Sequence, residues 1–256
     1  MLTEIELTIA GPVARIMLRG DKGVQILSRA TRQRLFEVLG DVEKTSTSVL
    51  VIAADGRTFI AGAAIDELRG LNEQSALEDS RAGQALMNRL ESLPQTTIAA
   101  IHSACAGGGT ELALACDLRF AAEGAKIGLP ETSLGVLPGW GGTVRATRLL
   151  GVAVARRLIL TGELICADEA LRIGLVDAVF LPDRFREELE ARVAQIVTRA
   201  PQARRRVKQL LRQHAADGVN LAKQFETEAR AFAECYRTSE PLEGQSAFLE
   251  KRNPRW

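Results

Sequence analysis

The chain has 256 residues, of which 46% are hydrophobic and 25% are charged, and its formal net charge is +1. This length can bury a sizeable core, as one large domain or as one domain with a helical extension. A charge so close to neutral provides no global field that would hold nucleic acid or an anionic membrane. No apolar run approaches about 20 residues, so we expect no membrane-spanning helix.

Cysteine and histidine usage narrows the class further. The four cysteines are scattered and show no CxxC spacing, which is typical of buried, reduced thiols, and we therefore expect a cytoplasmic protein. Only two histidines are present, which argues against a histidine-rich metal site or a histidine triad, and we expect no metal ion. The acidic start MLTEIELTIA lacks the basic-then-apolar pattern of a signal peptide and predicts a first strand.

The chain begins with a predicted hairpin and a predicted helix. Residues 4–11 and 13–20 alternate apolar and polar side chains on either side of a Gly-Pro turn, which predicts two antiparallel strands. Helical spacing follows over residues 28–44, and Ser28 is the expected N-cap.

Two buried strands are predicted next. Residues 48–54 form a short β-branched run, followed by a loop at 56–68 that leads into helical material up to about Leu93. Residues 97–104 form the second run, and His102 within it is expected to be a hydrogen-bonded core histidine.

The remaining pattern favours an α/β core with parallel strand pairing. Short strands are predicted at 118–121 and 125–129, and helices dominate from Gly139 onward, with one strand at 175–180. After about residue 195 there is no strand signal, and three amphipathic helices are expected.

The stretch TIAAIHSACAGGGTELALACDL predicts a strand, a turn and a helix. Its glycines, Gly107 to Gly109, would place bare backbone N–H groups at a helix start, a site that suits an oxygen carrying or developing negative charge. Glu111 falls on the apolar stripe of this helix, where a carboxylate needs partners or takes a raised pKa. The plainer alternative is an ordinary glycine turn with a glutamate that caps the helix.

Two other stretches share this glycine-rich character. In KIGLPETSLGVLPGWGGTVRATRLLG, Glu131 follows an apparent strand and PGWGG opens another helix. In GRTFIAGAAIDEL, Gly62 lies among small residues after a buried strand. Each alone is also compatible with a solvated turn or with an ordinary strand-to-helix connection.

Together, these three stretches strongly resemble the enoyl-CoA hydratase/isomerase, or crotonase, superfamily. GRTFIAGAAI is similar to its first oxyanion-loop motif, ACAGGGTELALACDLRFA to its second, and LPETSLGVLPGWGGTVRATRLLG to its third block. TGELICADEALRIGLVDAVF and the ending EGQSAFLEKRNPRW are similar too, so that the resemblance covers nearly the whole chain. It implies an α/β fold with a core of spiral ββα turns over residues 1–195. It also implies a helical region at 196–256 that makes trimer contacts, with hexamers as dimers of trimers.

The resemblance also implies an acyl-CoA substrate, in which coenzyme A is part of the substrate rather than a cofactor. By position in the motifs, the backbone N–H groups of Ala63 and Gly108 would form the oxyanion hole for the thioester carbonyl. The same motifs imply three further substrate-binding residues: Ala61, Ile65 and Gly139.

The family's hydratases carry two glutamates at the positions that Glu111 and Glu131 occupy here. The resemblance therefore favours hydration of a 2-enoyl-CoA, with Glu111 activating water and Glu131 delivering a proton to the α carbon. The alternatives are a Δ3–Δ2 enoyl-CoA isomerase that uses one glutamate, and a non-catalytic RNA-binding homologue. For the latter, Arg204 to Lys208 is the one basic cluster, and the solvated face of a helix is the better explanation of it. No nucleic-acid or membrane partner is expected.

Several positions leave the substrate contacts open. Ala64 stands where the family usually has Asp, and Gln25 stands where Asn is common. Arg57 either meets a CoA phosphate or is solvated, and Trp140 either lines the acyl pocket or packs the glycine turn. Phe248 and Lys251 either reach a neighbouring subunit's CoA site or only form an interface.

Overall fold

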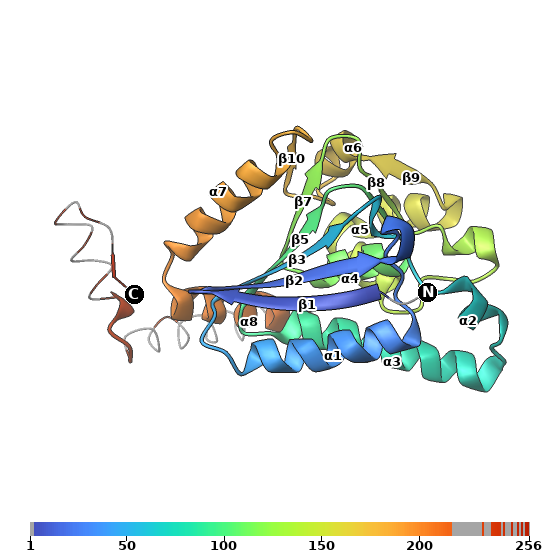
Figure 1. Ribbon diagram of the computed structural model, residues 1–256, viewed down its shortest axis with the longest axis horizontal. Helices are drawn as coiled ribbons and strands as arrows, with labels where there is room; N and C mark the ends of the chain where they lie inside the picture. Colours follow the sequence, from blue (N-terminus) through green and yellow to red (C-terminus); the bar gives the residue numbers. More distant parts are fainter. Residues whose placement is uncertain are drawn as a thin grey trace. The chain divides into compact units, whose positions relative to one another are not determined.

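The computed structural model describes residues 3–216, 232, 237–241, 243, 247, 250, 252 and 254–255. The chain divides into two units, Met1–Leu189 and Glu190–Trp256. The first unit holds all the strands in the described part of the chain (Figure 1). The assignment of residues 196–256 to subunit assembly stays a prediction, and Phe248 and Lys251 lie outside the described residues.

The predicted hairpin and first helix are confirmed. Strands β1 (Thr3–Ala10) and β2 (Val13–Gly20) pair antiparallel, and Gly11 supplies the left-handed turn with φ +55°. Helix α1 (Arg29–Glu43) starts where the Ser28 hydroxyl accepts a hydrogen bond from the Thr31 N–H at 3.2 Å.

A six-stranded sheet forms the centre of the first unit, in the order β1-β2-β3-β5-β7-β10. The strands added to the hairpin are β3 (Val49–Asp55), β5 (Thr96–Ile101), β7 (Leu118–Ala122) and β10 (Ala178–Phe180). From β2 onward every neighbouring pair is parallel, as predicted. Val49 to Ile52 are all almost fully buried, which explains the unbroken apolar run in the sequence.

A second, four-stranded sheet has the order β4-β6-β8-β9. Its members are three residues each: β4 (Thr58–Ile60), β6 (Ala104–Ala106), β8 (Lys126–Gly128) and β9 (Leu164–Cys166). Each of β3, β5 and β7 is followed by the next strand of this second sheet, so successive turns of the chain add one strand to each sheet. This arrangement confirms the expected ββα spiral.

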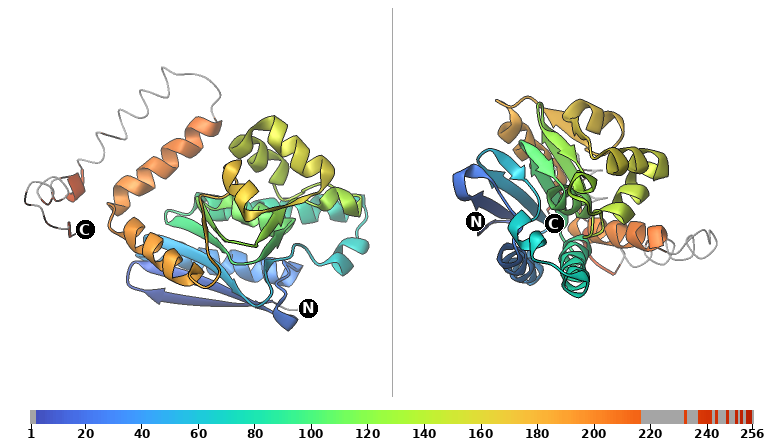
Figure 2. Two further views of the ribbon diagram at one scale, coloured as in Figure 1. Left: turned by 90° about the horizontal axis from the view of Figure 1, so that it is seen from above. Right: turned by 90° about the vertical axis from the view of Figure 1, so that its right-hand side faces the viewer.

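The helices of the first unit continue this winding. After α1 come α2 (Ile65–Arg69), α3 (Glu73–Ser92), α4 (Gly108–Ala115), α5 (Gly142–Thr161) and α6 (Ala167–Arg172), with short 3-10 turns η1 (Asp21–Gly23) and η2 (Glu131–Leu134). Helices α1 and α3 lie side by side (Figure 2), whereas α4 is buried along its whole length.

Two more helices follow. Helix α7 (Phe185–Val197) contains the division between the units, and α8 (Pro201–Ala216) belongs to the second unit. The rest of the predicted helical tail lies almost wholly outside the described residues. No helix within the described residues combines the length and apolar character needed to cross a membrane.

Four details differ from the sequence prediction. The loop at 56–68 contains β4 and the start of α2, β9 was not predicted, and the run 97–104 is two strands in different sheets. His102 lies at the break between them and is half-buried, with Nε2 at 3.0 Å from the Gly56 carbonyl oxygen, so its placement in a core strand was wrong. Three-residue strands are too short to show a periodic pattern.

Candidate active site

One cavity of about 410 Å³ in the first unit brings together the seven residues to which the family resemblance gave a catalytic, oxyanion-hole or substrate-binding role. They come from the segment after β4, the start of α4, η2, and the loop before α5. The residues are Ala61, Ala63, Ile65, Gly108, Glu111, Glu131 and Gly139. The spiral therefore gathers on one cavity motifs that are up to about 80 positions apart in the sequence.

Glu111 is fixed by two backbone donors. Its residue is only 2% exposed, and all eight residues of α4 around it are buried. Its Oε1 accepts hydrogen bonds from the Trp140 N–H at 2.7 Å and the Gly142 N–H at 2.8 Å. The loop before α5 and the first residue of that helix therefore satisfy one oxygen of an almost fully buried carboxylate.

Opposing effects set the pKa of Glu111. Burial raises it, and the negative charge of Glu131 raises it further, whereas the backbone donors, Gly142 foremost, and the charge of Arg145 lower it. The result is a pKa raised to about 7. A carboxyl group poised there exchanges protons readily at neutral pH.

Glu131 lies in a different environment. It opens η2, and its two carboxyl oxygens are buried with no hydrogen-bond partner in the part of the chain that the structure describes. Burial raises its pKa to about 7 as well, against the lowering effect of its own backbone N–H. Glu111 therefore has two backbone donors from another segment that stabilise its charged form, whereas the pKa of Glu131 is opposed only by its own backbone.

The backbone at the start of α4 has to be glycine for two reasons. Gly107 has φ +53°, and a Cβ there would lie 3.2 Å from Glu131 Oε1. Gly108 is the first helical residue, and a Cβ there would lie only 2.3 Å from Cζ3 of Trp140. The N–H groups of this first turn have no acceptor within the helix and stay available to a ligand.

The segment that carries Ala63 runs beside this helix start. The Gly62 carbonyl accepts from the Leu27 N–H at 2.9 Å, and the Ala61 N–H donates to the Gln25 carbonyl at 2.8 Å. A Cβ on Gly62 would lie 3.8 Å from the Gly108 nitrogen, so the two glycine-containing segments are neighbours.

The two departures from the family pattern have different structural consequences. Gln25 is fully buried, and its side chain hydrogen-bonds to Thr58 and to the Asp55 carbonyl, so it anchors the backbone next to Ala61. Ala64 is the N-cap of α2 and offers no side-chain oxygen to that helix.

Arg57 and Trp140 differ in their relation to the cavity. The Arg57 guanidinium is exposed, donates to the Lys22 carbonyl at 3.1 Å and does not line the cavity. Trp140 does both things that the sequence left open, because it lines the cavity and packs against Gly108.

Sequence reasoning missed most of the apolar wall and one charged residue. The missed apolar residues are Leu68, Leu71, Ala76, Leu134, Val136 and Leu137, and the charged one is Asp79. Three of these apolar residues lie within the turn SLGVLPG and were a usable signal, because a solvated turn has no need for them.

Comparison with known proteins identifies the class. The family model described as enoyl-CoA hydratase/isomerase matches residues 8–256. The short-chain-enoyl-CoA hydratase of Clostridium acetobutylicum is 36% identical over 98% of this chain and 96% of its own length. The crotonyl-CoA hydratase of Syntrophomonas wolfei is 35% identical over 94% and 92%. The crystal structure of an enoyl-CoA hydratase from Bacillus anthracis superimposes with a TM-score of 0.91 at 36% identity, covering 98% of both chains.

These matches extend over nearly the whole chain and agree with the spiral fold. The protein belongs to the enoyl-CoA hydratase/isomerase family, the crotonase superfamily.

Proposed function

We propose that this protein is an enoyl-CoA hydratase that adds water across the 2,3-double bond of a 2-enoyl-CoA to give a 3-hydroxyacyl-CoA. The observation that carries the proposal is the pair of carboxyl groups, Glu111 and Glu131, which line one cavity but differ in their hydrogen bonding. The two hydratases described above, similar over almost their whole length, support the same reaction.

The backbone N–H groups of Ala63 and Gly108 bind the thioester carbonyl oxygen in this mechanism. Negative charge grows on that oxygen as water attacks the β carbon, and fixed donors stabilise it without reorganising. The partial positive charge at the start of α4 acts in the same direction.

The two glutamates divide the proton transfers. Oε1 of Glu111 already accepts two N–H groups, so Oε2 takes the proton from the attacking water. Glu131 starts protonated and gives its proton to the α carbon as the enolate collapses. The new C–O and C–H bonds account for one water molecule, and a proton returning from Glu111 to Glu131, directly or through solvent, restores the enzyme. Acid–base steps of this kind contribute about 100- to 10,000-fold each.

The cavity wall favours an uncharged acyl group. Beyond the two glutamates, Asp79 is the only charged residue among the described ones that line it, and Leu134, Val136 and Leu137 extend the wall although they are 49–64% exposed. A terminal carboxylate on the acyl chain would meet apolar side chains and negative charge, and the described lining offers it no arginine or lysine. We therefore propose linear or branched hydrocarbon acyl groups as substrates.

Coenzyme A enters as part of the substrate, and the proposal needs no separate cofactor or metal. Assembly into a trimer or hexamer and a cytoplasmic location are proposed on the family resemblance. A native mass measurement of the purified full chain tests the assembly.

The test of function is hydration of crotonyl-CoA, followed by the loss of absorbance of the conjugated thioester. Wild type is run beside Glu111→Gln and Glu131→Gln, which keep side-chain size and remove the acid. We expect kcat to fall by about 100-fold or more in each variant. Turnover retained in either variant contradicts the role given to that glutamate. If the wild type does not hydrate crotonyl-CoA but isomerises a 3-enoyl-CoA, the protein is an isomerase and the proposed hydratase function is wrong.

A further inference from the structure

The Trp140 side chain occupies a slot between two helices. A Cβ on Gly83 of α3 would lie 2.1 Å from Trp140 Cδ1, and a Cβ on Gly108 of α4 would lie 2.3 Å from Cζ3. Both approaches are possible only because the two residues are glycines. Trp140 is 5% exposed, and its indole ring therefore packs tightly between α3 and α4 and supports the first turn of α4.

A buried ion pair holds the same ring from a third side. The Arg32 guanidinium carbon lies 4.4 Å from the centroid of the Trp140 ring. Arg32 also binds Asp79 through two contacts, Nη1–Oδ2 at 3.1 Å and Nη2–Oδ1 at 2.5 Å, and the Trp140 side chain lies close enough to Asp79 to help lower its pKa. Both charged side chains are only 8% exposed, so the ion pair beside the Trp140 ring is largely desolvated.

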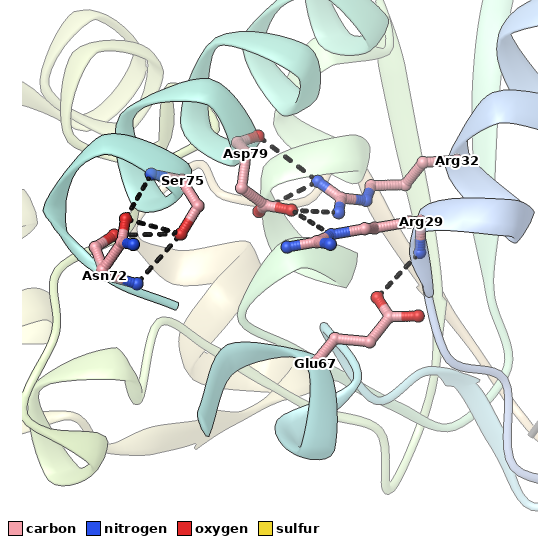
Figure 3. A network of polar contacts seen from close by, with 6 residues as sticks. All are labelled: Arg29, Arg32, Glu67, Asn72, Ser75 and Asp79. Atoms are coloured by element: carbon pink, nitrogen blue, oxygen red, sulfur yellow. Dashed lines mark hydrogen bonds and ion pairs between the residues drawn. The ribbon is translucent and has the colours of Figure 1, made fainter. Parts of the chain in front are cut away.

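Asp79 is held in place by a wider polar network, shown in Figure 3. Arg29 from α1 approaches Asp79 Oδ1 at 3.4 Å, and its own backbone N–H donates to Glu67 of α2 at 2.8 Å. Asn72 and Ser75 cap the start of α3, one turn before Asp79. Burial tends to raise the pKa of Asp79, but the hydrogen bonds and the positive charge of Arg32 outweigh it and lower the pKa, so Asp79 is ionised at neutral pH.

The backbone of Trp140 reaches the proposed base. Its N–H donates to Glu111 Oε1 at 2.7 Å, while Arg145 Nη1 donates to its carbonyl oxygen at 3.3 Å. One residue therefore joins the Arg32–Asp79 pair to the Glu111 carboxylate through its main chain and to Gly108 through its ring.

We propose that Arg32 and Asp79 are positioning residues that act through Trp140, fixing the backbone N–H that orients Glu111 and the ring that supports the Gly108 backbone. The catalytic roles of Glu111 and Gly108 rest on the proposed function. The positioning itself does not, because it is defined by contacts within the protein.

A purely structural role would not require this chemistry. A buried ion pair contributes little net stability, because the cost of desolvating both charges offsets their attraction, and apolar side chains of similar volume pack as well. Orientation is different, because a planar guanidinium stacked on an indole and paired to a carboxylate fixes the ring in one pose. Loss of that pose displaces the Trp140 N–H, so Glu111 loses one of its two donors and its pKa rises above about 7.

The variants are chosen to separate geometry from charge. The charged groups facing Glu111 are Glu131 from η2 and Arg145 from α5, with Asp79 from α3 lining the same cavity. Removing Asp79 alone changes the field at Glu111, whereas Arg32→Met combined with Asp79→Leu removes one charge of each sign. The paired replacement therefore tests position with the net charge unchanged.

Two single variants complete the set. Trp140→Phe keeps an aromatic ring and the backbone N–H but removes the indole donor. Asp177→Asn is the matched control, because Asp177 pairs with the buried Arg119 at 3.4 Å without touching Trp140.

Three measurements are made on the full chain. They are kcat and KM for crotonyl-CoA across pH, the titration of the Glu111 carboxyl by carbon NMR with Glu111→Gln as the assignment reference, and the emission of Trp140 in a Trp256→Phe background that leaves it the single tryptophan. For the paired replacement we expect kcat to fall about tenfold, equivalent to about 1.4 kcal/mol. KM should change by less than about twofold. The Glu111 midpoint and the acidic limb of kcat should both move to higher pH, and Trp140 emission should shift to the red.

Trp140→Phe should also move the acidic limb of kcat to higher pH, but by less than the paired replacement does. Asp177→Asn should leave kcat and the titration midpoint of Glu111 unchanged. A lower melting temperature with unchanged kcat, pH limb and Glu111 midpoint overturns the proposal, because the pair is then only structural. A change confined to KM and acyl preference also overturns it, because Asp79 then touches substrate.

If the paired replacement does not fold, the variant Arg32→Lys tests the proposal instead. Lysine keeps the positive charge but cannot stack a planar group on the indole, and an unchanged titration midpoint of Glu111 in this variant contradicts the proposal. A wild type that hydrates no thioester refutes the proposed function, while the NMR titration and the fluorescence still decide the positioning.

Discussion

Gly108→Ala is the sharpest probe of the proposed oxyanion hole, because a backbone donor cannot be removed by changing a side chain. The added Cβ would lie 2.3 Å from Trp140 Cζ3, more than 1 Å inside an ordinary contact of about 3.5 Å. The ring cannot retreat, because its other side lies against Gly83, where a Cβ would be 2.1 Å away. The first turn of α4 must move instead, and the Gly108 N–H moves with it.

The magnitudes follow from this geometry. Overpacking of a close-packed site costs about 1–3 kcal/mol of folding free energy. Displacing one oxyanion donor costs about 100- to 1,000-fold in kcat. We therefore expect Gly108→Ala to remain folded by circular dichroism, with a lower melting temperature, and to lose at least about 100-fold in crotonyl-CoA hydration.

The matched control is Gly70→Ala. Gly70 follows α2 with φ −85°, and its added Cβ would meet nothing closer than the Glu67 carbonyl oxygen at 3.8 Å, so activity and stability should stay near wild type. Combining Gly108→Ala with Trp140→Phe should recover part of the lost stability, because the smaller ring gives up the clashing atom. Wild-type kcat in Gly108→Ala would refute the reasoning that places the donor there.

Three further predictions test the electrostatics, the cavity wall and the departure at position 64. The pKa of Glu131 is raised to about 7 from 4.5, so its ionisation opposes folding, and this penalty is absent below about pH 4.5 and grows as pH rises to 7. In urea unfolding, the free energy of unfolding of Glu131→Gln should thus exceed that of wild type by about 1–2 kcal/mol at pH 8, after discounting for partial exposure, and should equal it near pH 4.5. A stability difference that does not change with pH contradicts this prediction. For a 2-enoyl-CoA with a terminal carboxylate, kcat/KM should be about 100-fold or more below that for the uncharged chain of equal length, because the buried charge costs more than about 2.7 kcal/mol. Leu137→Arg should reduce this difference in kcat/KM between the two substrates. Ala64→Asp should raise stability by about 0.5–1 kcal/mol through a new cap on α2, whereas Ala64→Val, which offers no oxygen, should not.

What the sequence could predict depended on the length of each signal. The hairpin, α1 and the buried runs of β3 and β5 have enough residues for periodicity to separate strand from helix. Strands β4 and β9 have three residues each, and their pairing is fixed by the neighbouring turns of the spiral rather than by a local pattern. Glu111 and Glu131 were found because a charge inside an apolar segment, or beside a glycine turn, is conspicuous in the sequence.

Asp79 could not be found in the same way. In the sequence it follows a glutamate on a helix with many polar residues, and nothing local separates it from an exposed acid. Its burial is created by Arg32, 47 positions earlier, and by Trp140, 61 positions later. Pairings over such distances are decided by the fold, so residues that position others are less visible to sequence reasoning than residues that carry the chemistry.

The burial of Glu111 among apolar residues has a physical reason. A solvated glutamate would keep a pKa near 4.5 and would hold a proton too weakly to accept one from water at neutral pH. Burial alone would keep it protonated and equally inactive as a base. The two N–H groups on Oε1 oppose that effect and leave the pKa near 7. Glu131 reaches a similar pKa by burial, opposed only by its own backbone N–H, and in the proposed mechanism this difference favours Glu111 as the base and Glu131 as the acid.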